Sequence, residues 1–296
     1  MAGGILAILD DVATLFDDAA VMSKVAAKKT AGLLGDDLAV NAEKATGFNA
    51  SRELPVIWEI TKGALLNKVI ILPIAFLLSA FAPWLIVPIL LLGGAYLSYE
   101  GAEKVVEWFT HTHTGKPIAS ESSDKNEILN SEASKIKAAI RTDFILSIEI
   151  IVITLETVIS QPLSIQIMVV SFIAFLATAG VYGVVALLVR MDDSGLYLIE
   201  RARMMTGSIA KGYQLLGELL INALPKVIRL LAIIGTIAML LVGGGMFVHN
   251  IDAVHKVVSF LPILAADLTV GLVVGFALLA SIHLLKLANI HKSLFS

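Results

Sequence analysis

Two carboxylates lie inside one of the most apolar parts of this chain. Glu149 and Glu156 are seven residues apart within the segment 142–160, so on a helix they share one face. A carboxylate at the middle of a bilayer costs roughly 2.5–3.5 kcal/mol on insertion scales, and it is usually paired, protonated or in contact with water. The pattern predicts a pathway or binding site for a proton or a cation. The alternative is that both side chains are protonated and only hydrogen-bond a neighbouring helix.

Other acidic residues extend this candidate site. Asp143 lies at the start of the same segment beside Arg141, and it forms either a surface ion pair or the mouth of the same pathway. Two Asp-Asp pairs beside the apolar segments are secondary candidates, because oxygen-rich clusters suit Mg²⁺, Ca²⁺ or Mn²⁺. Helix capping is the alternative for these pairs, which are Asp36 with Asp37 and Asp192 with Asp193.

The N-terminal segment carries a further group of acids on a helical period. Over residues 5–29, charged side chains gather on one face and apolar side chains on the other. One interpretation is an amphipathic helix on the membrane surface, although surface anchors favour Lys and Arg. The other is a helix of the bundle whose acids line a polar cavity. The acids in question are Asp11, Asp17 and Asp18.

The elements that must position these residues are membrane-spanning helices. Of the 296 residues, 57% are hydrophobic and 16% charged, with a mean hydropathy of +0.86, whereas soluble domains are about 45–50% apolar and about 25% charged. No run alternates as a barrel strand does, which leaves helices. The predicted spans are 64–81, 84–106, 142–160, 163–189, 225–248 and 261–288. A single kinked span over 64–106 is the alternative to the first two.

Composition excludes several classes of function. The balance of 22 Lys and Arg against 25 Asp and Glu gives no basic surface for nucleic acid. The absence of cysteine excludes disulfides, thiolate metal sites and cysteine nucleophiles. No phosphate loop, nucleophile elbow or zinc-helix motif occurs, so we expect no enzyme, no catalytic residue and no resident cofactor.

Lys and Arg predict the orientation in the membrane. They concentrate in the connection 110–141, in the connection 190–229 and at the C-terminus, and these regions lie on one side if the spans alternate. Basic loops are typical of the cytoplasmic side, so the linker and the C-terminus are expected there. Residues 1–9 lack a basic start, and no cleavable signal peptide is expected.

The order of the motifs suggests a duplication. An acidic pair six residues apart, an Asp-Asp pair, a proline and a Gly-Gly pair each occur twice, with offsets of 132 to 156 residues. The glycines predict close helix packing. If residues 5–29 are inserted, the two acidic helices run in opposite directions, as in the inverted repeats of secondary transporters. We therefore expect a first half (1–109), a polar cytoplasmic linker (110–134), a second half (135–260) and a terminal helix with tail (261–296).

The chain also resembles the YedI-type inner membrane proteins of bacteria, an uncharacterised family. The resemblance covers nearly the whole chain and rests on LDDVATLFDDAAVMSKVAAKKTAGLLGDDLAVNA, AIRTDFILSIEIIVI and ALLVRMDDSGLYL. A more distant resemblance, carried by DFILSIE and GGAYLSYEGAEK, is to the TerC-type proteins of the LysE transporter superfamily. Glu149 stands where that pattern has a second Asp, and the first half lacks the Glu-plus-Asp-Asn helix typical of that family. By analogy, this resemblance implies export of a divalent cation, with manganese favoured.

These observations predict an all-α polytopic helix bundle of the bacterial inner membrane with six or seven spans, made of two related, inverted three-helix halves and a terminal helix. The expected function is secondary transport of a small cation, either a divalent metal such as manganese or a cation coupled to protons. The alternative is a non-transporting scaffold that organises partners through its N-terminal helix and linker. The expected partners are the lipid bilayer and the small cation, and a homo-oligomer is left open.

Overall fold

The structure is a computed structural model that describes the backbone of residues 2–45, 52–110 and 125–294 and the side chains of 12–44, 52–110 and 132–284. Over these ranges the chain forms nine α-helices and one 3-10 helix, with no strand, and the predicted all-α fold is confirmed. The helices are α1 (Ala2–Ala45), α2 (Glu53–Phe81), η1 (Pro83–Leu85), α3 (Ile86–Thr110), α4 (Lys125–Thr157), α5 (Leu163–Val189), α6 (Met191–Arg203), α7 (Ser208–Asn250), α8 (Asp252–Val258) and α9 (Ile263–Leu294).

Five of the described helices are long and apolar enough to cross a membrane, and they make this a multi-pass membrane protein. They cover 52–81, 83–110, 163–189, 208–250 and 263–284. The region 64–106 forms two helices rather than one kinked span, because the chain breaks at Ala82 and η1 begins at Pro83. The predicted span 142–160 is not among the five. It belongs to α4, whose charged side chains lower its mean hydropathy, and neighbouring helices cover it.

The outer surface of the spans is apolar. In α5 the most apolar window has a mean hydropathy of 2.4, and only 44% of it is buried against other helices. Large side chains such as Trp58, Leu77 and Phe172 are about half exposed. Contiguous apolar surface of this extent is not found on soluble monomers, so a lipid bilayer is the environment that these helices require.

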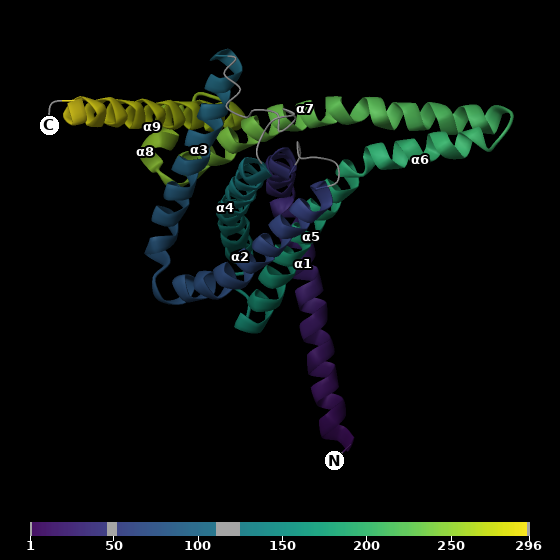
Figure 1. Cartoon of the computed structure of the whole chain (residues 1–296). Coiled ribbons are helices and arrows are strands. Elements are labelled where there is room, and N and C mark those ends of the chain that lie inside the picture. Colours follow the sequence, from purple (N-terminus) through teal and green to yellow (C-terminus); the bar gives the residue numbers. More distant parts are fainter. Residues whose placement is uncertain (1, 46–51, 111–124, 295–296) are drawn as a thin grey trace.

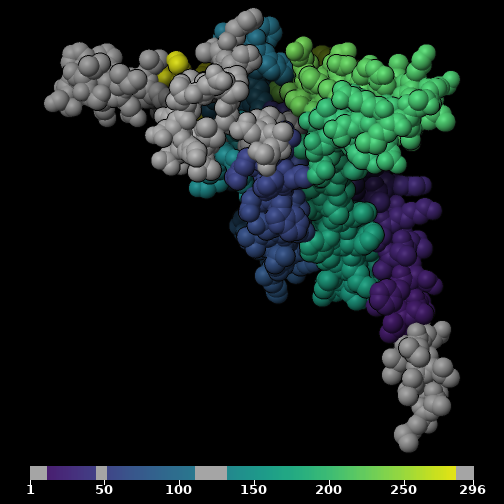
Figure 2. Space-filling model, turned by 45° about the vertical axis from the view of Figure 1, so that its right-hand side comes forward, coloured from purple at the N-terminus to yellow at the C-terminus, as the bar shows by residue number. Residues whose placement is uncertain are grey.

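The helices pack in two groups (Figure 1). The C-terminal part of α1 packs with α2, α4 and α5, and we call this the four-helix group. Helices α3, α7 and α9 pack on one another as the three-helix group, and α1 also contacts α7. The N-terminal part of α1 extends away from the other helices (Figure 1). The hairpin of α6 and the first half of α7 stands out from one side (Figure 2), and its turn uses Gly207 at φ 86°.

Glycines set the spacing of the three-helix group, as the Gly-Gly pairs predicted. A Cβ at Gly244 in α7 would overlap the carbonyl oxygen of Asp267 in α9, and one at Gly94 in α3 would lie 2.8 Å from the carbonyl oxygen of Gly243 in α7. The backbones therefore approach as closely as helices can, which is how small residues stabilise helix packing in lipid.

We expect Gly244→Ala to destabilise the protein by about 1–3 kcal/mol, because overpacking forces α7 and α9 apart. The matched control is Gly180→Ala in α5, where nothing lies within 4 Å of the added methyl group. Its stability should be unchanged or slightly higher, since Ala favours a helix more than Gly does. Thermal unfolding of both variants in detergent measures the difference. Equal melting temperatures would contradict the packing argument.

Candidate functional site

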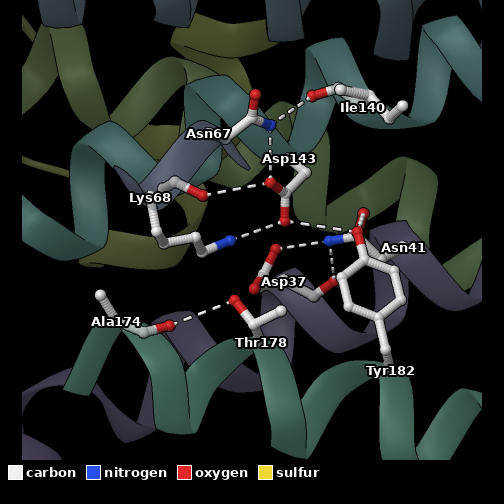
Figure 3. Close-up of polar contacts among 10 residues, drawn as sticks. Asp37, Asn41, Asn67, Lys68, Ile140, Asp143, Ala174, Thr178 and Tyr182 are labelled. Atoms are coloured by element: carbon white, nitrogen blue, oxygen red, sulfur yellow. Dashed lines mark hydrogen bonds and ion pairs between the residues drawn. The ribbon is translucent and has the colours of Figure 1, made fainter. Parts of the chain in front are cut away.

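Seven polar side chains meet in the interior of the four-helix group, and none is more than 8% exposed. We call them the central cluster (Figure 3): Asp37 and Asn41 from α1, Asn67 and Lys68 from α2, Asp143 and Ser147 from α4, and Tyr182 from α5. Lys68 lies near the middle of α2, which is one of the five spanning helices. The polar side chains of the cluster therefore lie at a depth in the membrane where lipid cannot solvate them.

Asp143 is the best-satisfied group of the cluster. Its Oδ1 lies 2.9 Å from Lys68 Nζ and 3.3 Å from the Tyr182 hydroxyl. Its Oδ2 accepts hydrogen bonds from Asn67 Nδ2 at 2.9 Å and from Ser147 Oγ at 3.4 Å. Three donors, one of them a cation, and the Tyr182 hydroxyl, whose single hydrogen is shared with Asn41 Oδ1, stabilise a charged carboxylate. The ion pair Lys68–Asp143 thus joins α2 to α4 in the protein interior.

Asp37 has far fewer partners than Asp143. Its Oδ1 accepts a hydrogen bond of 2.5 Å from Asn41 Nδ2, one turn further along α1. The Tyr182 hydroxyl lies 3.1 Å from Asn41 Oδ1, so the amide links Asp37 to α5. Lys68 attracts the charge of Asp37 and Asp143 repels it, but no Lys or Arg of the described residues forms an ion pair with Asp37.

The central cluster thus holds two carboxylates and one ammonium group. With Asp143 and Lys68 neutralising each other, an ionised Asp37 would be an uncompensated charge in a low-dielectric interior, which is strongly unfavourable. Asp37 must therefore hold a proton or have a cation beside it.

Ion pairs between α1 and α3 lie next to the central cluster in sequence. Lys44 pairs with Glu100, and Glu43 pairs with Lys104. Thr142, the neighbour of Asp143, donates a hydrogen bond of 3.2 Å to Glu100 Oε2. These contacts join α1, α3 and α4 at the same height in the bundle. They thereby fix the position of the four-helix group relative to the three-helix group.

A second polar site is a cavity of about 300 Å³ between α4 and α7. Its polar lining comes from Glu149 and Glu156 on α4 and from His249 and Asn250 on α7. The predicted pair of glutamates therefore faces one space. Glu156 and His249 are exposed at its rim, whereas Glu149 is half-buried.

Glu149 faces other carboxylates and no described cation. Asp36 and Asp37 on α1 and Asp267 on α9 are near enough to repel its charge. Among the described residues, none donates a hydrogen bond to it. No group of three or more His, Asp or Glu residues converges as metal ligands anywhere in the part of the chain that the structure describes.

The N-terminal acids lie apart from both sites. Asp17 and Asp18 are exposed on α1 between Leu15 and Ala19, which pack in the apolar core of the four-helix group, and the side chain of Asp11 lies outside the described residues. The predicted helix 5–29 continues to Ala45. Their role in the site stays a prediction, and the structure does not bring Asp17 or Asp18 to the glutamates of α4.

The two Asp-Asp pairs lie in different environments. Asp37 lies inside the central cluster and Asp36 is half-buried beside it, well before the end of α1, so these two residues do not cap a helix. Asp192 and Asp193 are in the first turn of α6, where Asp193 pairs with Arg190 at 3.1 Å on the surface. Helix stabilisation accounts for the second pair.

Several residues of these sites carry no strong signal in the sequence. Lys68 interrupts an apolar stretch of the sequence. The neighbouring Asn67 is the one local sign that this position is polar within a span. Tyr182 is a single polar residue in an apolar helix, and its partners Asn41 and Asp143 are 141 and 39 positions away. Asp267 and His249 lie near helix ends, where polar residues are ordinary.

We expect Asp143→Asn to cost about 3–5 kcal/mol of stability, because Lys68 remains buried without its counter-charge. The double variant Lys68→Met/Asp143→Leu should recover most of this loss, since it buries no charge. Asp193→Asn is the control and should cost about 0–1 kcal/mol, as exposed pairs do. Thermal unfolding in detergent compares the three. A double variant no more stable than Asp143→Asn would contradict the ion-pair argument.

Comparison with known proteins gives a family but no function. Residues 3–286 match the family described as "Protein of unknown function (DUF808)". No curated protein matches the chain, and no solved structure matches it. Since the family match spans nearly the whole chain, this helical membrane protein belongs to the uncharacterised DUF808 family.

Proposed function

We propose that this protein is a secondary transporter of a small cation, coupled to protons, in the inner membrane of a bacterium. The observation that carries the proposal is the excess of carboxylate in the interior: Asp37 and Asp143 share Lys68 as their one counter-charge within the central cluster. A site that must be neutralised by a proton or a cation, and that lies between spanning helices, has the properties that a carrier requires.

The proposed route to this site follows helix α4. It carries Asp143 in the central cluster, Glu149 in the cavity and Glu156 at the cavity's rim. At 1.5 Å per residue these three positions span about 20 Å, two thirds of the hydrocarbon core of a bilayer. Carboxylates at such intervals let a cation or a proton pass between the rim and the interior without crossing bare lipid.

Orientation and substrate belong to the same proposal. Basic loops favour a cytoplasmic linker and C-terminus. The cavity lies at the C-terminal ends of α4 and α7, and it would therefore open to the side opposite the cytoplasm. The resemblance to TerC-type transporters favours a divalent cation. The proposed inverted repeat makes α1 and α4 equivalent helices by matching Asp11 and Asp17 to Asp143 and Glu149. The acids of α1 that act on Glu149, however, are Asp36 and Asp37.

Glu149→Gln should abolish cation flux into proteoliposomes, because a neutral amide can neither bind nor relay the charge. The substitution keeps the side chain's shape and breaks no described hydrogen bond, so the fold should persist. Glu59→Gln on the exposed face of α2 is the matched control and should retain wild-type flux. Equal flux in wild type and Glu149→Gln would remove Glu149 from the mechanism.

Water access to Glu149 separates a transporter from a scaffold. The chain has no cysteine, so Glu149→Cys introduces a single reactive thiol. We expect a water-soluble maleimide to label it, because the cavity connects Glu149 to the exposed Glu156. Ile150→Cys on the next, buried position should stay unlabelled. If both variants resist the reagent while folded, the cavity is dry and the scaffold hypothesis is favoured.

A further inference from the structure

The hairpin of α6 and the first half of α7 begins at the boundary of the membrane. Asp192 and Asp193, in the first turn of α6, line one pocket with Glu53, which is at the start of the spanning helix α2. Trp58 follows shortly after on α2 and is 60% exposed. Exposed tryptophan is typical of the interface between lipid and water. The base of the hairpin therefore lies at the level where the spanning helices leave the lipid.

Helix α7 is too long to lie across a membrane over its whole length. It has 43 residues, which make about 65 Å at about 1.5 Å per residue, whereas the hydrocarbon core of a bilayer is about 30 Å thick. Residues 230–248 contain no charged side chain and suit the crossing, while Lys211 and Glu218 fall in the first half of the helix. That first half therefore lies outside the hydrocarbon core, and it extends sideways from the bundle together with α6 (Figures 1 and 2).

The hairpin carries large apolar side chains that the other described helices leave uncovered. On α7, Ile209, Leu216 and Leu219 are 66%, 55% and 58% exposed, and at about 100° per residue they lie on one face of the helix. Tyr197 on α6 is 62% exposed. An amphipathic helix with such a face lies in the plane of the membrane surface, with its apolar side at the boundary between headgroups and acyl chains.

The two helices of the hairpin pack closely against each other. A Cβ on Gly217 in α7 would lie 2.6 Å from the carbonyl oxygen of Gly195 in α6, so the two backbones are in direct contact. The exposed apolar face is therefore not used in the packing of the hairpin itself, and it is available to lipid.

The tip of the hairpin combines basic and apolar side chains. Residues 201–213 contain Arg201, Arg203 and Lys211 and no Asp or Glu. All three cations are exposed, and none forms an ion pair with another described residue. Met204, which lies between them in the sequence, is 80% exposed. Uncompensated positive charge around an exposed apolar side chain is complementary to a layer of lipid phosphates with acyl chains beneath it.

We infer that the hairpin lies in the membrane surface and binds anionic phospholipid, whose headgroups contact Arg201, Arg203 and Lys211 while Met204 enters the layer below. A lipid surface is favoured over a protein partner, because the hairpin begins at the membrane boundary and extends along the side of the bundle. The unpaired positive charge selects anionic over zwitterionic lipid. This inference concerns attachment to the membrane and is independent of the proposed transport function.

The test measures the depth of the tip in the full-length protein, held as one copy per nanodisc. The chain has no cysteine, so Met204→Cys accepts a single fluorophore. Iodide quenches a label in water, and lipids with brominated chains quench a label in the acyl layer. The discs contain phosphatidylcholine alone or an equimolar mixture with phosphatidylglycerol. In the mixture, the ratio of lipid-protected to water-exposed label should rise about fivefold or more, because each cation near an anionic surface contributes about that factor.

Two triple variants test the assignment of the cations, both labelled at Met204→Cys. The first replaces the three cations of the tip and should abolish the difference between the two lipid compositions: Arg201→Gln, Arg203→Gln and Lys211→Gln. The matched control removes the same charge from three exposed positions on α1 and should retain the difference: Lys24→Gln, Lys28→Gln and Lys29→Gln. A label at Asp252→Cys, at the exposed start of α8, gives the quenching of a position in water.

Each other outcome counts against the inference. Iodide quenching at the tip as strong as at Asp252→Cys, in both lipid compositions, would mean that the tip lies in water. Protection that is independent of lipid charge would overturn the role of the three cations. Protection that grows with protein concentration in detergent and is absent from nanodiscs would assign the face to a second copy of the chain.

Salt provides a measurement that needs no change at the cations. If the triple variant of the tip fails to fold, the protein labelled at Met204→Cys is compared at low and high KCl in the mixed discs. High salt should reverse the protection, because salt screens exposed charges. Protection that does not depend on salt would overturn the binding of anionic headgroups.

Discussion

The buried ion pair between Lys68 and Asp143 is the constraint on which the four-helix group depends. Neither charge can be left alone in the interior, because the cost of an unpaired buried charge exceeds that of most packing defects. The pair therefore fixes α2 against α4, and the Tyr182 hydroxyl extends the same constraint to α5. Through Asn41, Tyr182 also fixes α1. Hydrogen bonds and ion pairs, rather than the burial of apolar surface, define the register of these helices. Lipid tails are as apolar as the side chains that face them, so apolar burial alone does not favour one arrangement.

The three-helix group is held in a different way. Its helices approach through glycine, where backbone contacts replace side chains, and Gly244 lies against the backbone of α9. Such packing is rigid because any added atom must separate the helices. The cavity lies at the boundary between this group and α4. A polar space bounded by one rigid wall and one wall of ionisable side chains is suited to bind an ion reversibly.

Sequence patterns predicted five of the six apolar spans and the shared face of Glu149 and Glu156, because hydropathy and helical period are local properties. They did not predict the central cluster, because Asp143 and Lys68 are 75 residues apart and a partner at that distance is chosen by packing. The interpretation of Asp36 and Asp37 as caps was wrong for a related reason: α1 continues to Ala45 once α5 and α7 cover it.

Helix α1 connects the two ionisable sites electrostatically. Asp37 belongs to the central cluster, and both Asp37 and its neighbour Asp36 repel the charge of Glu149 across the interface with α4. In an interior of low dielectric constant, charges several ångströms apart interact far more strongly than in water. A proton or cation that neutralises Asp37 therefore weakens the repulsion on Glu149 and makes its ionised form easier to sustain. In the proposed transporter, occupancy of one site would therefore change the affinity of the other, which is the reciprocity that coupled transport requires.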